Sequence, residues 1–281
     1  MLRVREALPV VSERRACAVL ELARSSHRYE SRRPPREARL LEKLLALHAA
    51  HPRYGYRRMT ALLRRAGWTV NRKAVQRLWV LAGLQVLRKR CGKRRGRGAH
   101  SHLVAARPGE IWTLDFMHER TAEGRSLRLL GVLDEFTREC FAHVPDRRLT
   151  AEDVIDVLEG LVFRHGAPQY LRSDNGPEFV ADAIQGWLAE AKIATLYIAP
   201  GCPWENGKME SFNGKCREEF LDWELLGSVE ETAWLAERRR WHYNHERPHS
   251  ALGYLTPLEF KAKWLAEHGG VAAGRMTEAH G

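Results

Sequence analysis

Three acidic residues of this chain stand in settings where a carboxylate is unusual. Asp115 lies near the end of the apolar segment 110–117, Asp174 ends a short apolar segment before an Asn-Gly-Pro turn, and Glu210 lies inside the segment 205–220. A carboxylate next to an apolar strand costs several kcal/mol if it stays unpaired, so it needs a cation or hydrogen-bond donors. Three such groups brought together would form an all-oxygen site suited to Mg²⁺ or Mn²⁺.

The elements that must position these acids alternate between strands and helices. Thr150 with Asp153 three residues later predicts the capped start of a helix whose apolar stripe runs from Val154 to Leu161. The remaining pattern predicts strands at 110–117, 127–133, 140–144, 170–173 and 194–198, and further helices at 179–190, 205–220 and 229–243. Three strands followed by helix, strand, helix, strand and helices predict an α/β domain with a mixed sheet.

The charge of the chain is divided between its two parts. The 281 residues carry 46 Lys and Arg, 35 Asp and Glu, and a formal charge of +11. Residues 1–107 hold 27 of the basic residues and only 6 acids, so this part carries +21 and the remainder −10. A front part of this charge is typical of a polyanion-binding module, and the acidic part has carboxylates available for metal binding.

A pair of helices with a basic side is expected in this front part. Gly67 is suited to follow the first helix, Asn71 to cap the second, and Gly83 to end it. The basic and polar positions of the second helix are Arg72, Lys73, Gln76 and Arg77. This pattern predicts a DNA-binding helix-turn-helix, and an ordinary helical hairpin with a solvated basic face is the alternative.

Two expected linkers flank this part of the chain, one at Arg32–Pro35 and one in the basic run at 88–97. We expect Arg32–Pro35 to be a linker that interrupts the helical pattern. On the other side, a glycine-containing run predicts a flexible linker that follows DNA phosphates, the alternative being a solvated charge run. Its residues are Arg88, Lys89, Arg90, Lys93, Arg94, Arg95 and Arg97.

No membrane span or secretion signal is expected, because no apolar run approaches about 18 residues and the N-terminus lacks a long apolar stretch. The five cysteines lie far apart without a C-x-x-C pair, which favours reduced thiols in a cytoplasmic protein.

Several linked motifs occur in order along the chain. Asp174 and Glu210 are separated by 35 residues. The other segments are WTLDF at 112–116, LDEFTR at 133–138, SDNGPEF at 173–179, PGCPWENGKMESFNGK at 200–215, YNHERPHSALGYLTPLEF at 243–260, and YGYR at 54–57 with NRK at 71–73. With these motifs the chain resembles the insertion-sequence transposases with a retroviral-integrase-like D,D,35-E core, and more narrowly their downstream-frame protein. The resemblance runs from about residue 11 to about residue 263.

The resemblance implies a ribonuclease-H-like mixed sheet core with N-terminal all-α helix-turn-helix modules. It also implies that Asp115, Asp174 and Glu210 are both the catalytic residues and the ligands of two Mg²⁺ (or Mn²⁺) ions. Two such ions can serve cleavage by water and strand transfer by a DNA 3′-hydroxyl, since both are in-line displacements at phosphorus. In the family, transposition typically passes through a circular intermediate.

Helix geometry adds detail around Glu210. At 100° per residue, Asn206, Asn213, Gly214 and Arg217 project near Glu210. We expect Arg217 to grip a DNA phosphate, with an ion pair to Glu218 or Glu219 as the alternative. Lys208 and Lys215 project to a different side and are not expected next to the metal ions.

Three other features admit simpler interpretations. Asn175 could orient a metal-bound water or only satisfy its own turn. The histidines at 242, 245 and 249 match the family's C-terminal segment, so no zinc site is expected there. We expect the tryptophans at 79, 187, 234, 241 and 264 to be packing residues.

The expected organisation is a helical, helix-turn-helix-like segment at 1–33, a helix-turn-helix DNA-binding domain at 36–87, the basic linker at 88–107, an integrase-type catalytic core at 108–222, a helical extension at 223–267 and a disordered tail at 268–281. The expected function is Mg²⁺-dependent cleavage and joining of double-stranded DNA at element ends. At least a dimer is expected on DNA, and an upstream-frame protein or fusion segment is a possible partner. A catalytically silent DNA-binding regulator and a nuclease that cuts without joining are the rival interpretations.

Overall fold

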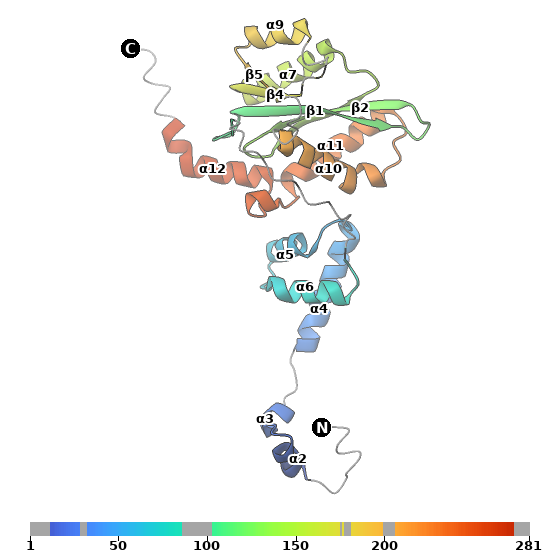
Figure 1. Cartoon of the computed structure of the whole chain (residues 1–281), viewed down its shortest axis with the longest axis vertical. Coiled ribbons are helices and arrows are strands. Elements are labelled where there is room, and N and C mark those ends of the chain that lie inside the picture. The colour runs from blue at the N-terminus through green and yellow to red at the C-terminus, as the bar shows by residue number, and fades with distance from the viewer. Residues whose placement is uncertain are drawn as a thin grey trace.

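The computed structural model describes residues 12–28, 33–85, 103–174, 176, 181–198 and 206–272. The described residues start with two short helices, α2 (Glu13–Val19) and α3 (Arg24–His27), joined by an ion pair between Arg28 and Glu13. Three longer helices and an α/β domain follow them (Figure 1). None of the helices in these ranges is long and apolar enough to cross a lipid bilayer.

The helices α4 (Arg33–Ala50), α5 (Tyr56–Arg65) and α6 (Arg72–Leu81) pack around one small core. Asn71 caps α6 by accepting a hydrogen bond from the Lys73 amide, and Gly67 and Gly83 adopt positive φ after α5 and α6, so these predicted helix ends are confirmed. The core residues are Leu40, Leu44, Tyr54, Met59, Leu63, Val75, Leu78 and Trp79.

The predicted linker at Arg32–Pro35 is wrong in part, because α4 already begins at Arg33. A proline in the first turn of a helix lacks only an N–H that has no partner there, so Pro34 and Pro35 are compatible with the helix start.

The mixed sheet predicted from the sequence is confirmed as five strands in the order β3-β2-β1-β4-β5. The strands are β1 (Ile111–Arg120), β2 (Ser126–Asp134), β3 (Cys140–Asp146), β4 (Tyr170–Ser173) and β5 (Ala194–Tyr197). The strands β1, β2 and β3 pair antiparallel, whereas β4 pairs parallel with both β1 and β5.

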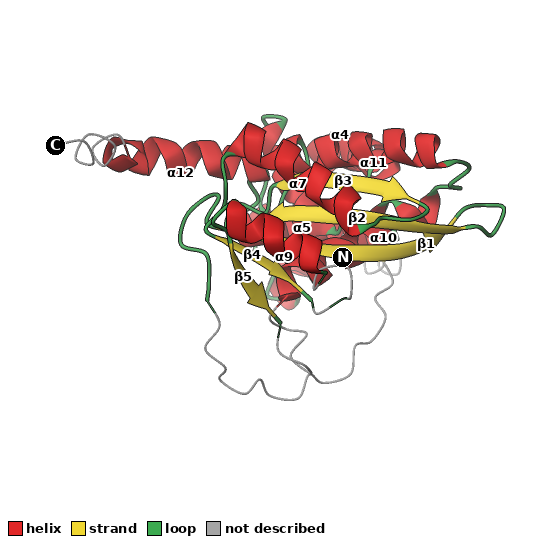
Figure 2. Cartoon of the chain, turned by 90° about the horizontal axis from the view of Figure 1, so that it is seen from above, coloured by secondary structure: helices red, strands yellow, loops and turns green. Residues whose placement is uncertain are grey.

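Helices cover both faces of this sheet (Figure 2). One face packs against α7 (Ala151–His165) and α9 (Asp182–Glu190), and Thr150 forms the predicted capping box with Asp153 at the start of α7. The other face packs against α10 (Gly207–Glu219) and α11 (Val229–His245). The short η2 (Leu221–Trp223) follows α10, and η3 (Ser250–Leu252) leads to α12 (Pro257–Ala272). Residues 268–272 therefore belong to a helix, which corrects the expected boundary of the tail.

The tryptophan prediction is only partly right. Trp79 is buried in the helical core, Trp187 packs against the sheet core, and the ring of Trp264 lies edge-on to that of Phe136. Trp234 and Trp241 are instead 63% and 49% exposed on α11. The helix α11 buries the face that carries Leu235, Ala236 and Tyr243. The presence of tryptophans in its sequence therefore did not show which side of the helix points inward.

Candidate active site

Asp115 lies on the face of β1 that α10 covers. Trp112, Leu114 and Phe116 belong to the core under α7 and α9. Because side chains alternate along a strand, Thr113 and Asp115 point to the opposite face of the sheet. The helix α10 contacts β1 on that face.

Asp174 follows β4, the strand next to β1, at the level of Asp115. Thr113 of β1 is paired with Arg172 of β4 in the parallel ladder. Two residues further along the two strands come Asp115 and Asp174, and Asp174 follows the last residue of β4 directly. Asp115 within β1 and Asp174 just after β4 therefore stand at matched positions of neighbouring parallel segments. The Gly176 amide donates a hydrogen bond of 3.0 Å to Asp174 Oδ1, which orients this carboxylate.

Two asparagines hold α10 against β1 on either side of Glu210. Thr113 Oγ1 donates to Asn206 Oδ1 at 2.7 Å, and Asn213 Nδ2 donates to Asp115 Oδ2 at 2.8 Å. Asn206 and Asn213 are seven residues apart and thus share one side of the helix, with Glu210 between them on that side. Glu210 itself is exposed.

The charge of Asp115 is unfavourable in this arrangement. Burial and the neighbouring Asp174 raise its pKa to about 6, although hydrogen bonds from the Phe116 amide and Asn213 oppose the shift and Glu210 adds to it. Both of the other acids thus act electrostatically on Asp115, and a cation between them would relieve this repulsion.

Within the described ranges, no three His, Cys, Asp or Glu side chains lie close enough together to hold one metal ion. The donor set nevertheless fits a hard divalent cation, because it offers only carboxylate oxygens and concentrates negative charge at a partly buried position.

Arg217 and Lys208 have partners that the sequence did not predict. Arg217 Nε pairs with Glu119 Oε1 on β1 at 2.9 Å, not with Glu218 or Glu219. Lys208 points away from Glu210 and pairs with Glu135, which lies just after β2.

The helix α6 presents the four positions expected to contact DNA. Arg72, Lys73, Gln76 and Arg77 are exposed, while Val75, Leu78 and Trp79 on the opposite side are buried. Arg77 forms an ion pair with Glu37 of α4. The other residues expected to bind DNA, namely Arg88, Lys89, Arg90, Lys93, Arg94, Arg95 and Asn175, lie outside the described residues.

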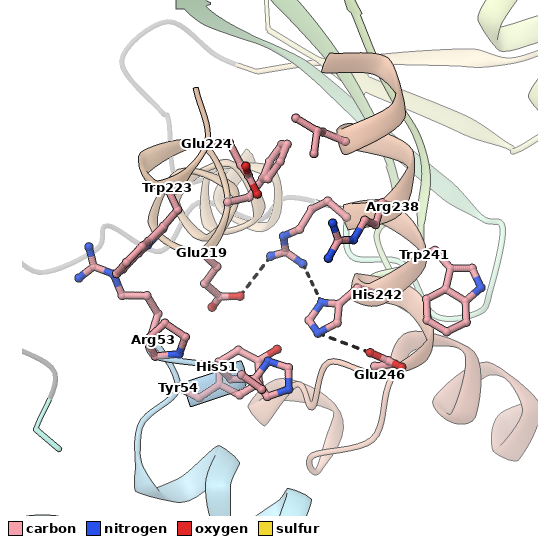
Figure 3. A pocket seen from close by; sticks show the side chains of 15 residues that line it. His51, Arg53, Tyr54, Glu219, Trp223, Glu224, Arg238, Trp241, His242 and Glu246 are labelled. Atoms are coloured by element: carbon pink, nitrogen blue, oxygen red, sulfur yellow. Dashed lines mark hydrogen bonds and ion pairs between the residues drawn. The ribbon is translucent and has the colours of Figure 1, made fainter. Parts of the chain in front are cut away.

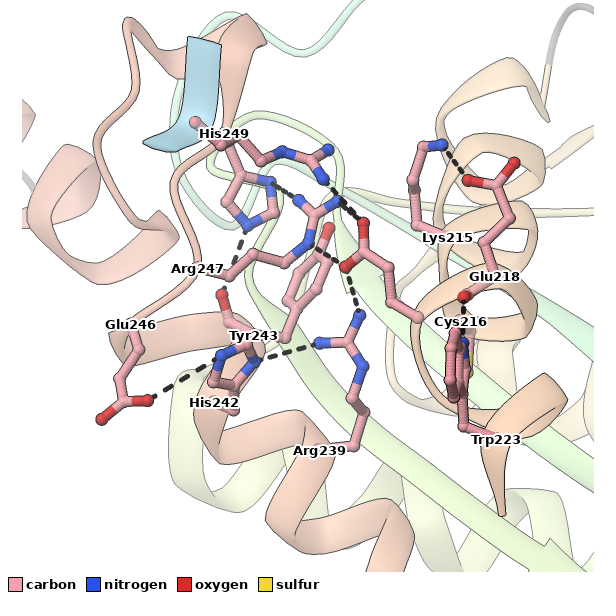
Figure 4. A network of polar contacts seen from close by, with 12 residues as sticks. Lys215, Cys216, Glu218, Trp223, Arg239, His242, Tyr243, Glu246, Arg247 and His249 are labelled. Atoms are coloured by element: carbon pink, nitrogen blue, oxygen red, sulfur yellow. Dashed lines mark hydrogen bonds and ion pairs between the residues drawn. The ribbon is translucent and has the colours of Figure 1, made fainter. Parts of the chain in front are cut away.

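The helical domain contacts the sheet domain through Glu219 at the end of α10. Figure 4 shows the network of polar contacts to which Arg239 and Arg247 belong. The two oxygens of Glu219 accept from Arg58 of α5 at 2.7 Å, from Arg247 at 2.7 Å by two bonds, and from Arg239 of α11 at 3.1 Å. Burial opposes ionisation of Glu219, but the hydrogen bonds and charges of Arg247, Arg58 and Arg239 outweigh it and lower the pKa to about 2. Sequence reasoning named Glu219 only as a possible partner of Arg217 and did not predict this group.

A pocket of about 540 Å³ opens beside this contact, between the α4–α5 turn and the helices α10 and α11 (Figure 3). The guanidinium of Arg53 lies 5.1 Å from the ring centre of Trp223 at its rim. The lining also includes His51, Tyr54, Arg238 and Trp241, together with Glu219, Glu224 and Glu246.

Comparisons with known proteins agree with this architecture. Two integrase core domain models match residues 105–203 and 191–257, and an HTH-like domain model matches residues 35–91. The structure of the simian T-cell lymphotropic virus intasome in complex with PP2A regulatory subunit B56 gamma superposes with a TM-score of 0.50 and 17% identity, covering 78% of this chain and 74% of that chain. The fold and its helical module thus define a protein with an integrase core and a helix-turn-helix-like domain.

Relatives in sequence identify the family. The insertion element IS407 uncharacterized 31.7 kDa protein of Burkholderia multivorans is 36% identical over 91% of this chain and 92% of its own length. The transposase for insertion sequence element IS904 of Lactococcus lactis is 27% identical over 84% of this chain and 98% of its own length. The chain belongs to the insertion-element transposases with an integrase core, and it is a DNA transposase, an enzyme of the polynucleotidyl-transferase type.

Proposed function

We propose that Asp115, Asp174 and Glu210 hold two Mg²⁺ or Mn²⁺ ions and that this site cuts and joins DNA at the ends of the element. The observation that supports the proposal is that β1, β4 and α10 each bring one of these acids to the same region. Asp115 and Asp174 stand at matched positions of neighbouring parallel segments, and Asn206 and Asn213, on either side of Glu210 in α10, both contact β1. The raised pKa of Asp115 supports it, because this carboxylate already senses both of the others.

The side chains of this site differ in how firmly they are held. Asp115 is fixed by the Phe116 amide at 2.8 Å and by Asn213, and Asp174 is oriented by the Gly176 amide. Glu210 is exposed, and we propose that it closes toward the aspartates when cation and DNA are bound. When bound by these carboxylates, divalent ions would supply activation of the attacking oxygen and stabilisation of the leaving one at the scissile phosphate.

The protein's contacts with DNA follow from its charged surfaces. We propose that α6 enters the major groove with Arg72, Lys73, Gln76 and Arg77, and that the basic residues at 88–97 follow the phosphates. Arg217 and Asn213, on the helix of Glu210, are proposed to contact the DNA beside the reacting phosphate. Because two element ends must be joined, we propose at least a dimer on DNA, acting in the cytoplasm, with an upstream-frame segment as a possible partner.

Asp115→Asn tests the catalytic proposal. The protein is incubated with labelled element-end oligonucleotides and Mg²⁺, and products longer than the substrate report joining while shorter ones report cleavage. A metal ion supplies several kcal/mol to such a reaction, and each 1.4 kcal/mol is a factor of ten, so we expect joining to fall about a thousandfold or more. Asp156→Asn, on the exposed side of α7, is the matched control and should keep wild-type activity.

The same assay separates the rival functions. Cleavage without longer products in the wild type would indicate a nuclease, and DNA binding without either product would indicate a regulator. A folded Asp115→Asn protein with normal joining would refute the assignment of the site.

A further inference from the structure

Glu135 is a completely buried acid that connects two separate elements of the active site. Its side chain is 0% exposed. One oxygen pairs with Arg172 Nη1 of β4 at 2.6 Å, and the other pairs with Lys208 Nζ of α10 at 2.7 Å. The second terminal nitrogen of Arg172 donates to the Leu103 carbonyl at 2.6 Å. One carboxylate is therefore shared between a strand end and a helix start.

Arg172 and Lys208, the two basic partners of Glu135, each lie two residues before a proposed metal ligand. Arg172 lies in β4 two residues before Asp174, which follows the strand directly, and Lys208 precedes Glu210 in α10. Residues two apart in a strand share a face, so fixing Arg172 fixes the direction in which the chain presents Asp174. In the helix, Lys208 and Glu210 project about 160° apart, so a bond to Lys208 restrains the rotation of α10 from the side away from Glu210.

Stability alone is a poor explanation for this arrangement. Two charges taken out of water lose hydration that their attraction barely repays, and apolar residues of similar size often stabilise a protein as well or better. A buried charged group that forms hydrogen bonds with two different elements does, however, fix the position of one element relative to the other. An apolar contact allows more variation in that position.

We propose that Glu135 is a positioning residue, which holds the end of β4 and the start of α10 at the separation that lets Asp174 and Glu210 share cations with Asp115. The inference rests on the proposed function of that site. It predicts that Lys208 contributes to cation affinity through Glu135, without contact to the cation or to DNA.

Lys208→Met provides the test, with Lys215→Met as the matched control on the same helix. Lys208 is 21% exposed, and its removal leaves the pair between Arg172 and Glu135 intact. Lys215 pairs only locally, with Glu218. Changes in residues that orient metal ligands typically cost 10–100-fold in affinity, so we expect Mn²⁺ binding, measured by electron paramagnetic resonance on the full chain, to weaken at least about tenfold in Lys208→Met.

Two further measurements make the test independent of catalysis. Hydrogen exchange of the amides of residues 207–213 should be faster in Lys208→Met than in wild type or Lys215→Met. Lys208→Arg, which keeps the charge and reach, should restore Mn²⁺ affinity, whereas Glu135→Asp, which shortens the acid, should reproduce the loss.

The outcomes separate this inference from the proposed function. If Lys208→Met keeps the Mn²⁺ affinity and the hydrogen exchange of the wild type, the inference is overturned. It is also overturned if Lys208→Met binds DNA more weakly without metal and the salt dependence of this binding falls by about one phosphate contact, because this result indicates that Lys208 contacts DNA directly. If hydrogen exchange is faster in Lys208→Met than in wild type but the wild-type protein binds no Mn²⁺, the proposed metal site is refuted and the positioning role is not.

Discussion

At the scale of single residues, burial decides the protonation state of His143, which lies against α10. His143 of β3 is buried 3.9 Å from Cys216 Sγ and faces the ring of Phe212. Burial, with a smaller contribution from Arg239, lowers its pKa to about 4. The imidazole is therefore neutral in the folded protein at pH 7 and serves as a packing group.

This depressed pKa predicts a loss of stability in mild acid. The unfolded chain binds a proton at the ordinary histidine pKa of about 6.5, whereas the folded chain does so near 4. The contribution of His143 is complete above the unfolded value and is lost as pH falls toward the folded one, at about 1.4 kcal/mol per pH unit. Urea unfolding between pH 7 and 4.5 should show a shallower pH dependence in His143→Phe than in wild type.

The exposed His245 provides the control for this prediction. His245→Gln should keep the wild-type pH dependence. Equal slopes in wild type and His143→Phe would show that His143 binds its proton at the same pH in the folded and the unfolded chain, contrary to this prediction.

At the scale of elements, the site depends on how closely α10 approaches the sheet. Gly131 of β2 is paired with Asp115 across the ladder. A Cβ at position 131 would collide with Met209 Cε and would lie 3.5 Å from Phe212 Cε1. The missing side chain thus makes room for the two apolar residues with which α10 packs on the sheet beside Glu210.

Gly131→Ala should therefore push Met209 or the helix away from β2. Overpacking of a well-filled core costs about 1–3 kcal/mol, and we expect this loss in urea unfolding together with reduced Mg²⁺-dependent joining. Gly186→Ala, in the middle of α9 with open space around it, should have the opposite sign and stabilise by roughly 0.5–1 kcal/mol. If Met209 simply rotates aside, Gly131→Ala will retain both stability and activity.

At the scale of the whole molecule, Glu219 links the helix-turn-helix domain to the helix that carries Glu210. Arg58 is the contribution of the helical domain, while Arg239 and Arg247 come from the α11 region. Arg65 of α5 adds contacts to the Glu246 and Tyr254 carbonyls and to Glu259. The position of α5 is therefore set relative to α10 and the α11 region by ionic contacts.

Glu219→Gln should destabilise the protein strongly. Removing one member of a buried ionic group leaves the arginines without their counter-charge, at a cost of about 3–5 kcal/mol. Glu218→Gln, at the next position, removes only an exposed pair with Lys215 and should change the free energy of unfolding by less than about 0.5 kcal/mol. Circular dichroism during urea unfolding measures both, and equal stabilities would show that Glu219 does not hold the domains together.

Local patterns in the sequence were sufficient for much of this architecture. The caps at Asn71 and Thr150 and the alternation of strands and helices depend on residues a few positions apart, so they can be read directly. Asp115, Asp174 and Glu210 were predicted as site residues from their unusual settings and from the spacing that resembles a family. The break at Arg32–Pro35 and the tail from residue 268 were misplaced, because proline is tolerated in a first helical turn and helix ends have weak signals.

Tertiary structure alone decided which charged groups meet. A charge at Glu135 between two apolar strands, or at Arg172 inside a short one, is a signal of an unusual environment, but its partner is not local. Glu135 meets Arg172 and Lys208 across 37 and 73 residues, and Glu219 meets Arg58 across 161. Apolar periodicity determined the elements because burial acts on each segment separately, whereas these ionic contacts depend on the packing of segments against one another, which no single segment encodes.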